Sequence, residues 1–176
     1  MRELSLSKVY QLLEPGPVVL LTTANRGRMN VMTMSWHMMV DFEPPLVACI
    51  VSNGDYSFTA LRRTCECVIA VPALHLAKTV VAIGNCSGRD LDKFVRFGLT
   101  AMAAAKVKAP LIKECFANLE CRVTDTRFVQ PYNLFILQVV KAWTDPSQKH
   151  PKTIHHVGYG KFIVDGRTLQ LRSRMR

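Results

Sequence analysis

The order in which strand-like and helix-like segments follow one another limits the possible folds of this chain more than any other feature. It begins with a predicted hairpin, in which the apolar runs 18–23 and 29–36 flank a turn at 25–28. The glycine in this turn can adopt the positive φ that a tight hairpin requires. A third run, 46–52, is apolar almost throughout, which is typical of a strand buried on both faces.

The rest of the chain mixes helices and strands without the regular alternation of a parallel α/β fold. In chain order we expect a helix at 56–63, a strand at 67–71 and helices at 74–83 and 90–97. Two long strands, 117–129 and 134–143, should follow and be joined at 130–133. Short strands are expected after residue 154, and a short helix capped by Ser5 or Ser7 near the start. Because this order is not βαβαβ, we expect a mainly β fold, a mostly antiparallel barrel with inserted helices, and not a doubly wound parallel sheet.

Length and composition favour one folded unit. The chain has 176 residues, of which 49% are hydrophobic and 20% charged. A chain of this length can bury a hydrophobic core without support from disulfide bonds or metal ions. Repeats and linkers are not apparent, so we expect residues 1–176 to form a single domain. The N-terminus lacks the pattern of a signal peptide, and apolar runs such as 17–24 fall short of the roughly 20 residues that span a bilayer. The expectation is a cytoplasmic protein that does not enter membranes.

The cysteines and histidines favour structural roles over metal binding or catalysis. Most of the six cysteines lie in apolar runs, where a free thiol packs as a small hydrophobe. Cys65 and Cys67 are two residues apart, so on a strand they would point to the same side, and no CxxC pair occurs. His155 and His156 are adjacent and the other histidines stand alone, so no metal site is expected. The sequence also has no G-x-S-x-G, HExxH or glycine-rich nucleotide loop.

The charge of the chain calls for an anionic partner. The net charge is +10 and the pI about 9.6, which suits nucleic acid, an anionic cofactor or an acidic redox protein. A nucleic-acid-binding barrel should interleave basic residues with exposed aromatic side chains, whereas Phe58, Phe116 and Phe135 are expected to be buried. We therefore expect no nucleic-acid partner.

Small polar residues occupy unusual positions on the second predicted strand. The hydroxyl groups of Thr33 and Ser35 can donate adjustable hydrogen bonds to a planar ligand, and Trp36 can pack against a ring system. Taken alone, this segment fits an ordinary edge strand with a core tryptophan better than it fits a ligand-binding strand.

Two further polar clusters precede predicted helices. Residues 52–59 form a turn that leads into a helix N-terminus, where free N–H groups and hydroxyls suit a phosphate. A simple helix cap by Asp55 or Ser57 is the alternative. Residues 87–93 are again a loop before a helix, with two cations in reach. The three clusters together favour an anionic ligand.

In this order and spacing, the segments resemble the flavin reductase-like proteins and, within them, the flavoredoxin group. The resemblance runs from residue 17 to about residue 140. It rests on residues 18–23, Asn30 with 33–36, 44–47, 56–59, 68–72, 87–94, 106–112 and 118–121.

The resemblance implies a split β-barrel homodimer that binds FMN near the subunit interface. In chain order, the residues that it places at the cofactor are Asn30, Thr33, Met34, Ser35, Trp36, Ser52, Asn53, Ser57, Thr59, Ser87, Arg89, Lys93, Tyr132 and Phe162. The strand 30–36 matches the part that holds the flavin ring and ribityl chain, and the turn 52–57 the part that meets the ribityl and phosphate groups. Lys93 matches the family lysine that approaches the flavin, and a surface ion pair is its alternative role. The group often has histidine at the position of Tyr132.

The resemblance also implies an oxidoreductase whose chemistry belongs to the bound FMN. Two forms are expected, an NAD(P)H:flavin oxidoreductase and a flavoredoxin-like electron carrier. The electron donor would be NAD(P)H or an acidic electron-transfer protein such as a ferredoxin. The alternative is a non-catalytic FMN-binding, storage or sensor protein, which would not oxidise NADH or NADPH in the steady state.

Overall fold

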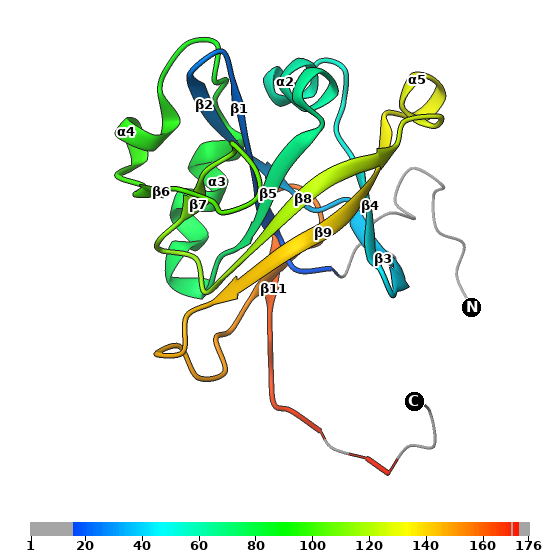
Figure 1. Ribbon diagram of the computed structural model, residues 1–176. Coiled ribbons are helices and arrows are strands. Elements are labelled where there is room, and N and C mark those ends of the chain that lie inside the picture. Colours follow the sequence, from blue (N-terminus) through cyan, green and yellow to red (C-terminus); the bar gives the residue numbers. More distant parts are fainter. Residues whose placement is uncertain (1–15, 170, 173–176) are drawn as a thin grey trace, which may run out of the picture.

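A seven-stranded sheet forms the centre of the computed structural model, which describes residues 16–169 and 171–172 (Figure 1). The strand order is β2-β1-β5-β8-β9-β4-β3, and all neighbouring strands pair antiparallel. The strands are β1 (Val19–Asn25), β2 (Arg28–Met34), β3 (His37–Phe42), β4 (Pro45–Ile50), β5 (Glu66–Val71), β8 (Ala117–Asp125) and β9 (Leu134–Thr144). The expected mainly β, mostly antiparallel fold is confirmed. The expected helix near residues 9–13 lies outside the described residues.

The sheet curls because its two edge strands follow each other directly in the chain. β2 ends at Met34 and β3 begins at His37, so Ser35 and Trp36 alone join strands at opposite edges. The carbonyl oxygen of Trp36 accepts a hydrogen bond from the backbone N–H of Ile50 at 3.0 Å, which anchors this corner to the end of β4. The edges must therefore approach each other, which makes a split barrel.

The apolar run at β1 is buried on both faces of the sheet. Val19 and Leu21 belong to the cluster that fills the barrel. Val18, just before the strand, and Leu20 pack on the other side with side chains of α3 (Ala77–Gly84) and α4 (Lys93–Phe97). Burying a side chain of this kind contributes roughly 1.5–3 kcal/mol. This two-sided burial explains why the segment reads as continuously apolar and not as alternating.

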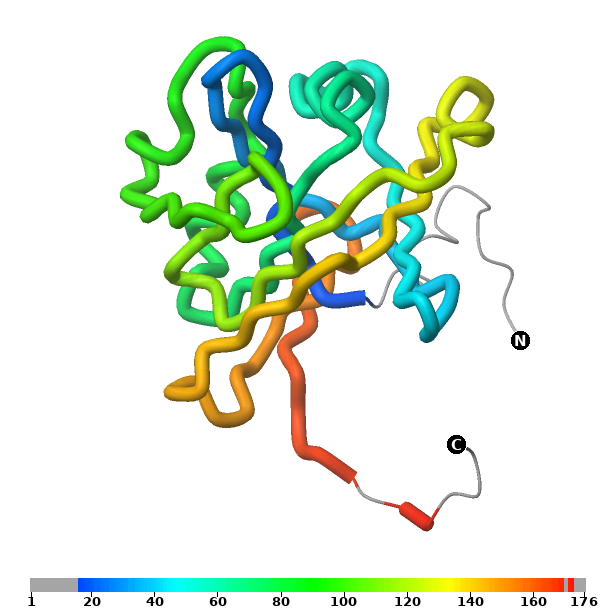
Figure 2. Tube along the Cα trace, viewed as in Figure 1, coloured from blue at the N-terminus to red at the C-terminus, as the bar shows by residue number. Residues whose placement is uncertain are grey.

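The remaining elements surround the sheet. α2 (Tyr56–Thr64) contacts β1 and β2, while the 3₁₀ turn η2 (Leu74–Leu76) leads into α3. Two small sheets, β6 (Ala101–Met102) with β7 (Leu111–Ile112) and β10 (Ile154–His156) with β11 (Phe162–Val164), and the short α5 (Val129–Tyr132) complete the fold. Residues 166–169, after β11, run away from the body of the molecule (Figure 2).

The first hairpin has the expected geometry. Asn25 pairs with Arg28, which leaves a two-residue loop of Arg26 and Gly27. Both loop residues have positive φ, 52° and 77°, as a tight hairpin loop with the correct twist requires.

Several elements differ from the sequence prediction, among them β3, α4 and β8, and the short strands β6 and β7 were not predicted either. The strand β3 was not predicted, because Met38, Met39 and Val40 are consecutive apolar residues without alternation and the strand lies at an exposed edge. α4 begins at residue 93 and not at 90, because the Asp92 carboxylate caps it by accepting two backbone N–H groups. β8 ends at residue 125, and residues 129–132 form a helical turn that ends at Asn133 in the left-handed conformation.

All six cysteines are free thiols. Burial raises the pKa of Cys49 and Cys115 to about 12, so both are unreactive core residues. Cys65 lies just before the predicted strand 67–71 and is not part of β5. It ends α2 with φ 54° and is exposed, whereas Cys67 is buried on β5, so the two side chains do not share a strand face.

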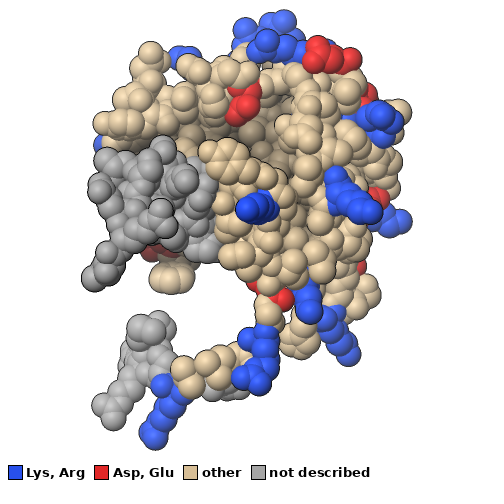
Figure 3. Space-filling view, turned by 180° about the vertical axis from the view of Figure 1, so that it is seen from behind, with Lys and Arg blue, Asp and Glu red and all other residues tan. Residues whose placement is uncertain are grey.

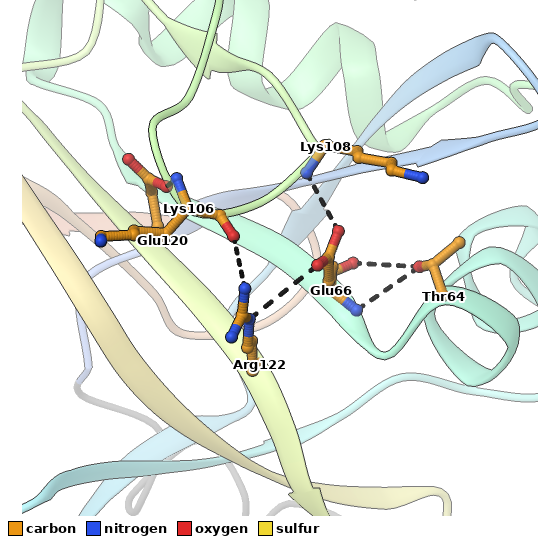
Figure 4. Close-up of polar contacts among 6 residues, drawn as sticks. All are labelled: Thr64, Glu66, Lys106, Lys108, Glu120 and Arg122. Carbon is orange, nitrogen blue, oxygen red and sulfur yellow. Dashed lines mark hydrogen bonds and ion pairs between the residues drawn. The ribbon is translucent and has the colours of Figure 1, made fainter.

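One polar cluster serves the fold by holding residues 105–108 against the sheet (Figure 4). Glu66 accepts the backbone N–H of Lys108 at 3.0 Å and Arg122 donates to the carbonyl oxygen of Lys106 at 2.8 Å. Glu120 is fully buried and accepts hydrogen bonds from backbone N–H groups of the same segment and from Trp143. Burial opposes ionisation of Glu120, but these donors outweigh it and lower its pKa.

The surface carries scattered positive charge, with Lys and Arg side chains spread over the face in Figure 3 and gathered at its top. Phe58 and Phe135 are buried with ring centres 5.6 Å apart, while Phe116 is half-buried and not buried as expected. In the described residues, helices are all too short or too polar to cross a membrane. The same part of the chain has no group of three or more His, Cys, Asp or Glu side chains suited to a metal ion.

Candidate functional site

A cavity of about 320 Å³ brings the three polar clusters of the sequence together. It lies between β2, the start of α2, the end of α3 and the start of α4, and β2 contacts each of these helices. It is lined by Asn30, Met32, Thr33, Gly54, Asp55, Tyr56, Ser57, Ile83, Gly84, Asn85, Cys86, Ser87, Gly88 and Lys93. Five of these were predicted at the cofactor: Asn30, Thr33, Ser57, Ser87 and Lys93.

Lys93 places a buried positive charge in the cavity wall. It is the first residue of α4 and only 5% exposed, so the alternative role as a surface ion pair does not hold. Its Nζ donates to the carbonyl oxygen of Ile83 at 2.9 Å, the one hydrogen bond of this ammonium within the described chain. Burial lowers the pKa of Lys93, while Cys86 and Asp55 act in the opposite direction. An ammonium with three donors in this setting favours an anionic ligand.

Asn30 and two glycines let the backbone approach closely on either side of the cavity. Asn30 Nδ2 donates to Ser57 Oγ at 2.8 Å, which ties β2 to the first turn of α2. A Cβ on Gly88 would lie 2.0 Å from Asn30 Oδ1, so only glycine fits there. A Cβ on Gly84 would lie 3.5 Å from Thr33, whose hydroxyl donates to the Val80 carbonyl oxygen at 2.6 Å.

A second hollow of about 310 Å³ adjoins the first. The two share Thr33, Gly84 and Asn85, so they form one continuous site. The second hollow contains two further predicted residues, Ser35 and Phe162. One half of the combined site is therefore polar and cationic, and the other half carries aromatic and aliphatic side chains.

Seven predicted residues lie outside both hollows, and for four of them the reason is strand geometry or exposure. Met34 points into the barrel core, since it alternates with Thr33 on β2. Trp36 is 52% exposed and lines a separate apolar pocket of about 220 Å³. Tyr132 is 66% exposed on α5, and Thr59 is exposed on α2.

The turn before α2 is organised differently from a simple helix cap. Ser52 and Asn53 are exposed and do not line the cavity. Asp55 occupies the N-cap position of α2, but its carboxylate accepts the backbone N–H of Ser52 at 3.0 Å and does not cap the helix. The hydroxyl oxygen of Ser57 accepts a hydrogen bond from the side-chain amide of Asn30. Arg89 is likewise exposed beside the cavity.

Several lining residues were not predicted. Tyr56 lies within the predicted cluster 52–59 and Cys86 lies next to the cluster 87–93, and the fold brings both to the cavity. The Cys86 thiol donates to the carbonyl oxygen of Ala82 at 3.3 Å. A glycine followed by asparagine at residues 84–85 is a typical helix end, the one local signal that could have marked this wall of the cavity.

Comparison with known proteins identifies the family of the chain. Residues 12–161 match the flavin reductase like domain. The chain is 30% identical to the uncharacterised protein YddH of Escherichia coli, over 93% of this chain and 94% of that protein. Its structure is similar to an FMN-binding domain of a flavin reductases-like enzyme from Shewanella baltica, with a TM-score of 0.83 and 26% identity over 96% of both chains.

The flavoredoxin of Desulfovibrio vulgaris shares the fold, with a TM-score of 0.81 and 21% identity over 97% of this chain and 93% of that one. The matched segment includes every strand of the central sheet and every residue that lines the first cavity. The chain therefore belongs to the flavin reductase like domain family.

Proposed function

We propose that the chain binds FMN in the continuous site and uses it as an oxidoreductase. The observation that carries the proposal is the buried ammonium of Lys93 in a cavity that also presents Asn30 and Ser57. The close backbone approach at Gly88 gives this cavity a fixed shape. The Shewanella baltica relative, described as FMN-binding, supports the choice of ligand.

Different residues of the site would hold different parts of the cofactor. Lys93 supplies positive charge for an anionic ligand, and Ser87 and Asn85 add polar groups to the same wall. Phe162 and His156 in the adjoining hollow offer apolar and aromatic surface for a ring system. Bound FMN would supply the hydride- and electron-transfer chemistry, and these residues would hold and orient it. The protein contributes position, charge and exclusion of water.

Titration of FMN into the flavin-free protein, followed by flavin fluorescence, tests the binding step. Steady-state oxidation of NADH and NADPH by the FMN-loaded protein then tests the reductase form. Oxidation of a pyridine nucleotide supports an NAD(P)H:flavin oxidoreductase. Reduction by an acidic protein donor without such oxidation supports a flavoredoxin-like electron carrier, which the net charge of +10 favours. Failure to bind FMN contradicts the proposal.

The proposal includes a homodimer, and an exposed apolar edge strand supports it. On β3, Met38 is 63% exposed and Phe42 is 88% exposed. An edge strand with such side chains favours association with another chain. Light scattering should return about twice the chain mass of 19.8 kDa, and Phe42→Asp should shift the protein toward the monomer. A monomeric wild type that holds FMN contradicts this part.

A further inference from the structure

Arg28, at the start of β2, is hydrogen-bonded to the backbone of the turn 87–89, which forms one side of the cavity. Its Nη2 donates to the carbonyl oxygen of Gly88 at 2.6 Å and to that of Arg89 at 3.3 Å. Its guanidinium carbon lies 5.2 Å from the centre of the Tyr56 ring. Gly88 and Tyr56 line the cavity, whereas Arg28 lies behind them. One side chain thus ties the start of α2 to the segment after α3.

The turn that Arg28 holds is compact. The backbone N–H of Asp90 donates to the carbonyl oxygen of Ser87 at 3.2 Å, and the N–H of Arg89 donates to the Ser87 hydroxyl at 3.2 Å. On its inner side, Gly88 leaves no room for a Cβ beside Asn30 and Tyr56. The turn therefore packs closely against Asn30 and Tyr56, which blocks an inward shift, and its backbone is held by Arg28.

We propose that Arg28 is a positioning residue for the cofactor, which holds the turn 87–89 closed on bound FMN and so slows its release. This inference rests on the proposed FMN binding. Ser87 and Gly88 share the cavity with Lys93, so an outward shift of the turn opens the polar end of the site. A hydrogen bond from a charged donor shifts an equilibrium by roughly tenfold to a hundredfold. Changes at a binding site act mostly on the dissociation rate.

The first experiment measures FMN dissociation from the reconstituted protein. Arg28→Ala should speed release by about tenfold or more, because the charged donor is lost. Arg28→Lys should lie between Arg28→Ala and the wild type, because an ammonium can still donate to the Gly88 carbonyl oxygen but lacks the planar guanidinium that faces the Tyr56 ring. Arg26→Ala is the matched control, since it removes the same charge from the same hairpin.

The second experiment needs no cofactor. Hydrogen exchange in the flavin-free protein reports on the turn through the protected amide of Asp90. Arg28→Ala should speed exchange at this amide while leaving the strands β5 and β8 unchanged, and Arg26→Ala should do neither. If the wild type bound no FMN, the proposed function would fall, and the exchange measurement would still decide whether Arg28 holds the turn. The inference is overturned if Arg28→Ala and Arg26→Ala behave alike in exchange, or if FMN leaves both at the wild-type rate.

Discussion

Replacing Lys93 by methionine removes the buried positive charge of the site and keeps most of the side-chain volume. The ammonium is 5% exposed and has Ile83 as its hydrogen-bond acceptor within the described chain. In the free protein the ammonium is therefore poorly compensated, and burial lowers its pKa. A bound anion would complete its hydrogen bonds and favour its charged form.

The size of the effect follows from the kind of bond that is lost. A hydrogen bond between charged groups contributes roughly 1.5–3 kcal/mol. At about 1.4 kcal/mol per factor of ten, Lys93→Met should weaken FMN binding by roughly tenfold to a hundredfold. The flavin-free variant should unfold within about 1 kcal/mol of the wild type, because relief of the desolvation cost offsets the lost hydrogen bond.

Fluorescence titration of FMN into both proteins, together with urea unfolding of the flavin-free forms, measures the two effects separately. Lys78→Met on the exposed side of α3 removes the same charge away from the site and should leave affinity unchanged. The affinity advantage of the wild type over Lys93→Met should shrink as pH rises through the lowered pKa of Lys93, because the neutral amine attracts an anion poorly. Equal affinities for wild type and variant at neutral pH would refute the reasoning.

Three further outcomes are expected. Gly88→Ala should abolish tight FMN binding, because its Cβ would lie 2.0 Å from a side-chain oxygen, whereas Gly166→Ala, whose Cβ would meet no atom within 4 Å and which lies outside the cavity, should bind normally in the same titration. Glu120→Gln should lower the free energy of unfolding by about 1–3 kcal/mol at neutral pH. Because the pKa of the Glu120 carboxyl is lowered in the folded protein, the difference between variant and wild type in urea unfolding should vanish as pH falls through that pKa. A difference that stays constant with pH would contradict the assignment. Bound FMN should protect the Cys86 thiol, which lines the cavity, from alkylation. The exposed Cys65 should be alkylated at the same rate with and without FMN. Mass spectrometry of the labelled peptides measures both rates.

Local patterns predicted those parts of the fold that local physics decides. The run 18–23 is apolar throughout because both faces of β1 are covered, and the hairpin turn follows from the positive φ of Gly27. The strand β3 escaped prediction because its exposed apolar residues do not alternate in polarity, and an edge strand has a neighbour on one side only.

The site could be predicted only in part, because it is assembled from distant segments. Asn30, Ser57 and Lys93 were placed by resemblance to a family, and the fold brings them to one cavity. Met34 was included because it stands within the same segment, but alternation along β2 turns it to the core. Arg28 contacts a carbonyl 60 residues away, a pairing that no local pattern predicts.

Identification of the chromophore released on heating the purified protein tests the central claim most directly. The account predicts a yellow protein that releases FMN, in amounts close to equimolar with the chain, because the cavity of about 320 Å³ carries one buried cation and the chain has no dinucleotide loop for an adenylate half. Release of FAD alone, or of no flavin even after reconstitution with FMN, would contradict it.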